Sequence, residues 1–196
     1  MTSSELKAYY PKDRRAWRSW LEKNHAKSPG IWLIYYKKTS GRPRLEYSDA
    51  VEEALCFGWI DSTVRPIDEK KYMQRFTPRK PKSGWSGLNK RRVEKMIAQN
   101  LMTKAGFEKI EEAKKNGAWQ HLDHIEALTL PEDFDKALSK NRKAKINFEN
   151  FPQFTKKQFL YRINSAKRPE TRKERIKLLV KMAAANKKPS VEGFKL

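Results

Sequence analysis

The sequence predicts an α+β protein, in which a small antiparallel sheet of about three strands with N-terminal helices precedes a mainly helical C-terminal half. Three observations predict this class. Segments 59–64 and 72–76 are rich in aromatic and β-branched residues and are separated by a turn at Pro66, which indicates a hairpin. The short apolar run 31–36 indicates a third, buried strand. From Ser86 onwards, apolar residues recur at helical spacing.

Two helices are expected around the first strand. Asp13 is a typical N-cap, and tryptophan and leucine side chains follow it at helical spacing until the turn at 28–30. A second helix is expected after Ser48, and Gly58 stands where a glycine commonly ends a helix. The first strand therefore has a helix on either side of it in the chain.

The second half of the sequence contains several helix start and stop signals. Thr103 and Thr155 precede amphipathic segments and are expected to cap them. Pro131 and Pro169 suit the first turn of a helix, and 116–117 is an Asn-Gly pair that ends one. This half is therefore expected to contain successive helices and no strand.

We divide the chain into an α+β part, 1–102, and a basic helical part, 103–196, which ends in a loose tail from 187. We expect the two parts to pack together because no long Gly/Ser linker separates them.

The chain contains 44 Lys and Arg against 23 Asp and Glu, so its formal net charge is +21. Residues 136–196 contain 18 basic and 4 acidic side chains and account for +14 of that charge. Such an excess is expected to face solvent or an anion.

Several protein classes are excluded by what the sequence lacks. No apolar run approaches the roughly 18 residues of a membrane span, and the first ten residues do not resemble a secretory signal. The single cysteine, Cys56, excludes an internal disulfide framework and is expected to be a buried structural thiol. A cytoplasmic location is therefore predicted. His121 and His124 are too few for a metal site, and no cofactor motif is present, so no metal or cofactor is expected.

Three sequence blocks, 53–62, 76–89 and 166–172, resemble the YdeI/OmpD-associated family, also called bacteriocin-protection proteins. The resemblance extends from about Tyr10 to about Asn186, and the blocks are long and rich in Trp and Pro. It implies a role in envelope stress or antimicrobial-peptide resistance. It also implies an envelope protein, such as a porin, as a partner.

The loop between the hairpin and the next helix is the candidate binding site. It combines cations, hydroxyl groups and glycines just before a helix N-terminus, where free N–H groups attract anions. A phosphate or carboxylate could be held there, with an indole ring stacked on its organic part. The simpler alternative is that Ser86 caps the helix, Trp85 is a buried plug and the cations are solvated. The candidate ligand-binding residues are Trp59, Asp61, Arg65, Arg79, Lys82, Ser83, Trp85, Ser86 and Asn89.

No catalytic residue is assigned from the sequence. Asp61 is the one weak candidate, because an acid among aromatic residues could act as a general base. The alternative is a structural ion pair that Asp61 forms with Arg65 or Arg79.

Three functions follow from these features. The first is a non-catalytic anion- or partner-binding protein of stress or bacteriocin resistance, which uses the loop and Asp61. The second is a nonspecific binder of nucleic acid or an anionic membrane surface through the basic C-terminal helices. The third is an enzyme that acts on a small anionic substrate, with Asp61 as acid or base and Arg79 as clamp. We favour the first, because no catalytic constellation is recognisable.

Overall fold

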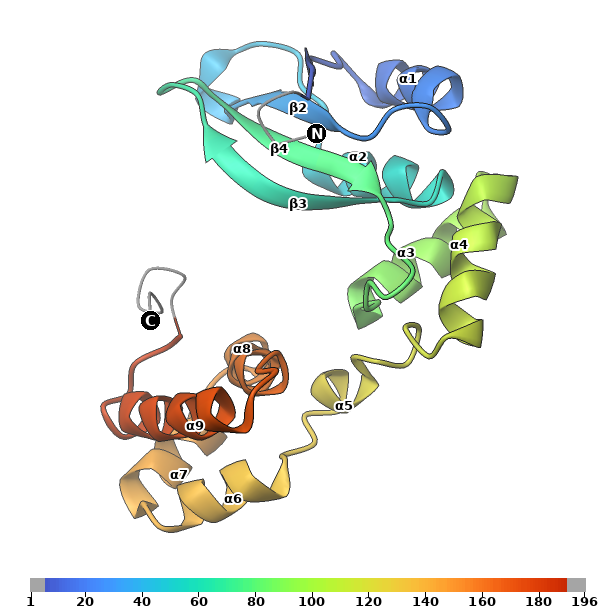
Figure 1. The fold of residues 1–196 in the computed structure, drawn as a ribbon. Helices are drawn as coiled ribbons and strands as arrows, with labels where there is room; N and C mark the ends of the chain where they lie inside the picture. The colour runs from blue at the N-terminus through green and yellow to red at the C-terminus, as the bar shows by residue number, and fades with distance from the viewer. Residues whose placement is uncertain (1–5, 190–196) are drawn as a thin grey trace. The chain divides into compact units, whose positions relative to one another are not determined.

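A computed structural model describes residues 6–189 of the chain. They divide into two compact units, an N-terminal unit that ends at Leu122 and a C-terminal unit that begins at Asp123 (Figure 1). In chain order, the N-terminal unit contains β1 (Ala8–Tyr9), α1 (Arg14–Asn24), β2 (Ile31–Tyr36), the short 3-10 helix η1 (Lys38–Ser40), α2 (Tyr47–Cys56), β3 (Trp59–Pro66), β4 (Lys71–Pro78), α3 (Gly87–Ala98) and α4 (Lys104–Lys115).

The sheet has four strands in the order β1-β2-β4-β3. The predicted antiparallel hairpin is confirmed as β3 and β4, and β2 pairs antiparallel with β4. The predicted count of about three strands and the purely antiparallel pairing are wrong, because β1 pairs parallel with the outer edge of β2. A strand of two residues carries too little alternation for sequence reasoning to recognise it.

One face of the sheet is covered by α1 and α2 and forms the core. Ile31 pairs with Phe76 across β2 and β4, so their side chains lie on the same face. Trp17 of α1 meets the ring of Phe76 edge-on at 5.5 Å, and its Nε1 donates to the carbonyl of Ala50 in α2 at 3.0 Å. Sheet, α1 and α2 therefore share one apolar cluster.

A network of charged groups crosses the packed helices of this unit. Glu52 and Glu53 of α2 are only 5% and 2% exposed. Arg14 of α1 contacts both carboxylates, at 3.0 and 2.6 Å, and Arg18 contacts Glu53 at 2.8 Å. Lys95 of α3 contacts Glu52 at 2.7 Å. Buried carboxylates are stable only when they are paired in this way, so the network fixes how α1, α2 and α3 meet.

Several predicted helix starts are confirmed. The Asp13 side chain accepts from Ala16 N at 2.7 Å, and Thr103 caps α4. The last helix, α9 (Pro169–Ala184), has its proline in the first turn. Side-chain capping and the fixed φ of proline are local effects, which explains why the sequence alone predicts them.

Other predicted starts are wrong. Ser48 lies inside α2, whose N-cap is Glu46, and the Glu46 carboxylate pairs with Arg44 and makes no capping bond. Thr155 is buried within the first turn of α8 (Gln153–Asn164), which begins after Pro152. In both cases an extended residue just upstream provides the helix start without a side-chain cap.

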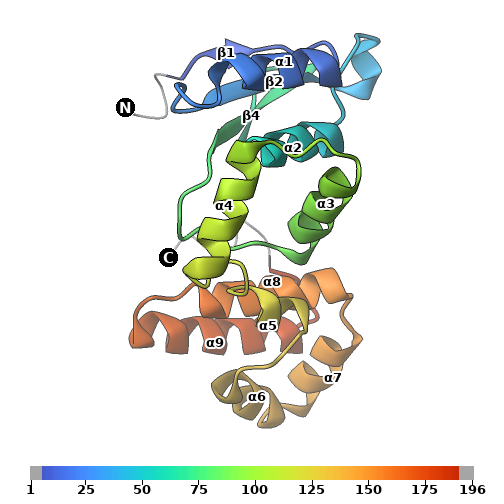
Figure 2. The same ribbon diagram turned by 90° about the vertical axis from the view of Figure 1, so that its right-hand side faces the viewer.

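The C-terminal unit contains only helices within its described part. They are α5 (Asp123–Glu126), α6 (Glu132–Ser139), α7 (Arg142–Asn150), α8 and α9. Pro131 is the N-cap of α6 and lies just outside the first turn predicted for it. Figure 2 shows α9 alongside α8, and α7 also packs against α9. The Asn147 side chain on α7 donates to the carbonyl of Ala183 at 2.8 Å and so caps the end of α9.

An aromatic cluster forms the core of this unit. Phe134, Phe148, Phe151 and Phe159 are buried and contact one another through their rings.

The mainly helical C-terminal half that the sequence predicted is present. Within the described residues, no helix combines the length and apolar character that crossing a membrane requires. The tail predicted from 187 lies outside the described residues from 190 onwards.

The boundary between the units falls after Leu122 and not after residue 102, because α4 packs on α2. Gly106 of α4 approaches α2 so closely that an added Cβ would lie 2.4 Å from the carbonyl oxygen of Cys56. Thr103 N also donates to that oxygen, at 3.2 Å. The first helix after the predicted boundary therefore belongs to the N-terminal unit.

We predict that Gly106→Ala lowers the free energy of unfolding by about 1–3 kcal/mol, because the methyl group collides with backbone. The collision outweighs the higher helix propensity of alanine, which by itself would stabilise the helix by about 1 kcal/mol relative to glycine. Urea unfolding followed by circular dichroism measures the change. The exposed substitution Glu108→Ala on the same helix is the control and should have little effect. A Gly106→Ala protein as stable as the wild type would contradict the close approach of α4 to α2.

Candidate functional site

The candidate site lies where β3 and β4 pass the start of α2. We use the name Asp61 cluster for Tyr35, Tyr47, Asp61, Gln74 and Arg79. Asp61 pairs with Phe76 across β3 and β4, and Gln74 is two residues before Phe76 on β4. Since alternate residues of a strand share a face, Asp61 and Gln74 both lie on the face that α1 and α2 cover.

Asp61 is held by two hydrogen-bond donors. Its Oδ2 accepts from the hydroxyl of Tyr47 at 2.9 Å and from Nε2 of Gln74 at 2.7 Å. Partial burial, reinforced by the charge of Asp61, raises the pKa of Tyr47 to about 12 although the residue is 42% exposed, so its hydroxyl remains a donor at neutral pH. The carboxylate is therefore fixed in place by neutral donors and pairs with neither Arg65 nor Arg79, contrary to the structural alternative considered from the sequence.

Tyr35 contributes an unused donor to the cluster. It pairs with Tyr72 across β2 and β4, and the two rings stack with centroids 5.1 Å apart. The side chain is 2% exposed, and its hydroxyl has no hydrogen-bond partner among the described residues. Burial raises the pKa of Tyr35, and nearby Tyr72 and Asp61 act in the same direction. A buried hydroxyl left without a partner costs about 1–3 kcal/mol.

Arg79 contributes a second unused donor and a buried positive charge. It lies just after β4, is 4% exposed, and its guanidinium carbon is 3.6 Å from the centre of the Trp85 ring. Nη2 donates to the carbonyl of Gly84 at 2.9 Å and weakly to that of Ser83 at 3.4 Å. Nη1 is buried without a hydrogen-bond partner among the described residues. Burial lowers the pKa of Arg79 to about 10, partly offset by Asp61.

The rest of the candidate loop builds the junction to α3. Trp85 is buried and its ring lies 4.9 Å from that of Trp119. Ser86 caps α3, accepting from Asn89 N at 3.3 Å, and the Asn89 side chain accepts from Nη1 of Arg92 at 3.0 Å. Trp85 and Ser86 thus have the plug and cap roles that the sequence offered as the simpler alternative.

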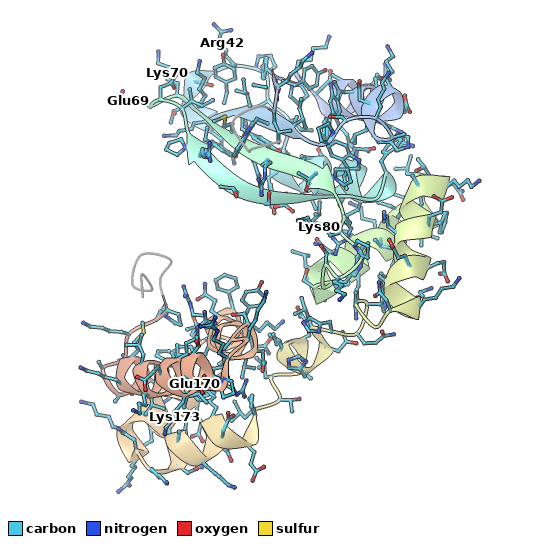
Figure 3. All side chains as sticks on the ribbon, viewed as in Figure 1. Arg42, Glu69, Lys70, Lys80, Glu170 and Lys173 are labelled. Atoms are coloured by element: carbon cyan, nitrogen blue, oxygen red, sulfur yellow. The ribbon has the colours of Figure 1, made fainter. Side chains whose placement is uncertain are left out.

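Three predicted site residues lie apart from the Asp61 cluster. Arg65 pairs with Met73, which faces the opposite side of the sheet, and its guanidinium stacks on Trp32 at 4.8 Å. Trp59 is a core residue whose Nε1 donates to the carbonyl of His25 at 3.2 Å. Lys82 is exposed in the loop after β4, as is Lys80, which is labelled in Figure 3.

Sequence reasoning missed Tyr35, Tyr47 and Gln74 as members of the cluster. Gln74 gave a usable signal, because it is a polar residue between Tyr72 and Phe76 at the period-two positions of a core-facing strand. Tyr35 and Tyr47 gave none, because an aromatic side chain in a strand or at a helix start is ordinary. The cluster as a whole offers spare N–H and O–H donors, and such groups suit a ligand rich in acceptor oxygens.

No arrangement of three or more His, Cys, Asp or Glu side chains that could hold a metal occurs in residues 6–189. His124 instead lies 2.9 Å from the side-chain amide of Asn164.

Cys56 is buried at the end of α2, as the sequence predicted. Burial, reinforced by the charge of Glu53, raises the pKa of its thiol to about 11. We therefore predict that at about pH 8 native Cys56 reacts with iodoacetamide at least about tenfold more slowly than in the urea-unfolded chain, because the thiolate is scarce and shielded. Mass spectrometry of timed aliquots measures the rates. Equal rates in native and unfolded protein would show that the thiol is accessible.

Comparison with known families divides the chain in the same region as the structure. Residues 9–109 match a family described as "Domain of unknown function (DUF8412)", and residues 127–186 match one described as "Bacteriocin-protection, YdeI or OmpD-Associated". Searches of curated proteins and of solved structures gave no match. The first match contains the Asp61 cluster, and the second covers most of the C-terminal unit. The chain therefore belongs to the DUF8412 family through residues 9–109, and its C-terminal helices match the bacteriocin-protection, YdeI or OmpD-associated family.

Proposed function

We propose that this protein is a non-catalytic anion-binding protein and that Arg79 is the residue that holds the anion. One observation carries the proposal: a guanidinium that is 4% exposed has no ion pair among the described residues and keeps Nη1 without a hydrogen-bond partner. Buried charges in proteins are normally paired, and the neighbouring network of Arg14 with Glu52 and Glu53 follows that rule. Arg79 departs from it.

The contacts of Arg79 satisfy only some of its hydrogen-bond donors and do not neutralise its charge. The ring of Trp85 supports the flat guanidinium, and two backbone carbonyls occupy Nη2. Neither supplies the full negative charge that would offset the cost of removing an arginine from water. A small oxyanion at Nη1 would supply it, and arginine is the side chain best suited to binding carboxylate or phosphate oxygens.

The loop after β4 is the route by which we propose the anion enters. Lys80 and Lys82 are exposed there, and Ser83 N closes a turn on the carbonyl of Lys80 at 2.9 Å. The two ammonium groups raise the local concentration of anions, and opening of the turn exposes Nη1. The Asp61 carboxylate is held by Tyr47 and Gln74 and makes no direct contact with Arg79, so it does not compete with an anion for Nη1.

The family matched by the C-terminal helices adds the biological setting of the proposal. Its description, bacteriocin-protection, YdeI or OmpD-associated, supports a role in resistance to bacteriocins. We propose that the protein acts from the cytoplasm, where a single free thiol stays reduced.

We predict that phosphate raises the melting temperature of the wild type more than that of Arg79→Met. A hundredfold excess of phosphate over its Kd would stabilise the wild type by roughly 2.7 kcal/mol through binding. Differential scanning fluorimetry at constant ionic strength, with chloride as the reference, measures the shift. Each protein's shift is referred to its own melting temperature without phosphate, because Arg79→Met loses the Trp85 stack and the hydrogen bond to Gly84 as well as the desolvation cost.

Lys80→Met is the matched control, since it removes the same positive charge from an exposed position next to Arg79 in the chain. It should keep most of the phosphate shift, and Arg79→Lys should keep a reduced one, because lysine retains the charge but not the planar fork. An undiminished shift in Arg79→Met would refute the role of Arg79. If Arg79→Met and Lys80→Met lost the phosphate-induced shift equally, the shift would arise from general electrostatic attraction and not from a site at Arg79.

A second candidate function is nonspecific binding of nucleic acid by the C-terminal unit. Residues 123–196 contain 18 basic and 9 acidic side chains. Exposed cations on α7 and α9 take part in none of the ion pairs of the described residues, and Lys173 among them is labelled in Figure 3. They include Arg142, Lys143, Lys173 and Lys181. Exposed, unpaired cations are the groups that neutralise phosphates in such complexes.

We predict that affinity for labelled single-stranded DNA falls steeply with salt and that the double substitution Arg142→Gln/Lys143→Met reduces the slope of log K against log salt by about 1–2. Fluorescence anisotropy at several salt concentrations measures the slope, and vesicles of anionic lipid serve as the competing surface. Absence of DNA binding at low salt would remove this candidate. Preference for the vesicles would replace it with a membrane-surface function.

A further inference from the structure

The C-terminal unit contains a small pocket whose residues have no role in the functions above. It has a volume of about 210 Å³ and is formed by the segment before α6 together with α6, α7 and the start of α8. Its lining residues are Leu128, Leu130, Asp135, Leu138, Lys145, Phe148, Glu149 and Lys156. Pockets for drug-sized ligands measure roughly 300–1,000 Å³, so this one suits a smaller molecule.

The floor of the pocket is apolar. Leu138 and Phe148 are buried, and Leu128 and Leu130 are half-buried beside them. Phe148 is held by edge-on contacts with Phe134 and Phe159, so the floor is part of the rigid core of the unit. A floor of this kind favours an aliphatic or aromatic group of a ligand.

Leu128 occupies a strained backbone position at this pocket. Its φ is 57°, in the left-handed region, just after the short helix α5. Leu128 N donates to the carbonyl of Ile125 at 3.1 Å and Thr129 N to that of His124 at 2.9 Å, which is the hydrogen-bonding of a helix end where glycine is usual. The chain therefore has a leucine where a glycine would be less strained, and that leucine side chain lines the pocket.

The rim of the pocket carries charges of both signs. Asp135 and Glu149 are exposed, and the ion pairs of the unit join other residues, so neither carboxylate is neutralised within the described chain. Lys145 is exposed on α7, and Lys156 donates to the backbone carbonyl of Glu149 at 2.8 Å. Two carboxylates and two ammonium groups thus surround an apolar floor.

We infer that this pocket binds a free amino acid with an apolar side chain of about the size of leucine. The ammonium group of such a ligand would meet Asp135 or Glu149, its carboxylate would meet Lys145 or Lys156, and its side chain would lie on the floor. A simple anion would leave the two rim carboxylates unpaired, and a simple amine would leave the lysines unpaired. The inference is independent of the anion proposal, because all its residues belong to the other unit.

Titration of the full-length protein with L-leucine, followed by isothermal titration calorimetry and by amide chemical shifts, tests the inference. We expect saturable binding with shifts concentrated at 128–130 and 145–149. N-acetyl-leucine, which lacks the ammonium group, and leucinamide, which lacks the carboxylate, should each bind about tenfold more weakly, since each loses a charge-assisted contact. Alanine should also bind more weakly, because it leaves the floor uncovered.

Two variants separate binding from folding. Leu128→Gly removes a wall of the pocket but relieves the left-handed strain, so we expect leucine affinity to fall about tenfold while urea stability does not fall. Lys145→Met should weaken binding of L-leucine more than binding of leucinamide. Lys143→Met, an exposed lysine of the same helix outside the pocket, is its matched control and should bind like the wild type.

Absence of saturable leucine binding would overturn the inference. It would also be overturned if N-acetyl-leucine or leucinamide bound as tightly as leucine, because the paired charges of the rim would then have no role. Unchanged affinity in Leu128→Gly would show that leucine binds elsewhere. Arg79→Met should bind leucine like the wild type, so failure of the anion proposal and failure of this one remain distinguishable.

Discussion

The stacking of Arg79 on Trp85 is the interaction on which the junction between the sheet and helices α3 and α4 depends. The backbone N–H of Arg79 donates to the carbonyl of Gly58, just before β3, and its side chain binds the turn that precedes α3. Trp85 in turn packs on Trp119 beyond the end of α4. One buried cation therefore joins the end of the hairpin to the helices that follow it, and no carboxylate within residues 6–189 forms an ion pair with that cation.

The buried carboxylates of the N-terminal unit, unlike Arg79, form ion pairs. Glu52 and Glu53 are as deeply buried as Arg79, yet each is contacted by two cations from neighbouring helices. That network is a structural device, since each of its two buried carboxylates is paired with cations and it fixes how three helices meet. The contrast within one unit is what gives the unpaired guanidinium its functional interpretation.

Local chemistry was predictable from the sequence, and long-range pairing was not. The caps at Asp13 and Ser86 and the hairpin of β3 and β4 depend on neighbours within a few residues, so pattern and propensity sufficed to predict them. Arg65 was placed with Asp61 because the two are close in the chain, but the irregular pairing of β3 between Asp61 and Val64 puts Arg65 on the other face. Tyr35 reaches the cluster only through the order of the strands, which the sequence does not reveal.

In the function we propose, an anion neutralises Arg79 inside the folded protein. Crystals grown in selenate and measured at the selenium edge reveal such an anion, because the anomalous signal locates it independently of any protein atom. We predict an anomalous peak within hydrogen-bonding distance of Nη1 of Arg79, with the Trp85 stack preserved. A map with selenate only at surface lysines, and with water or protein atoms at Nη1, would contradict the account.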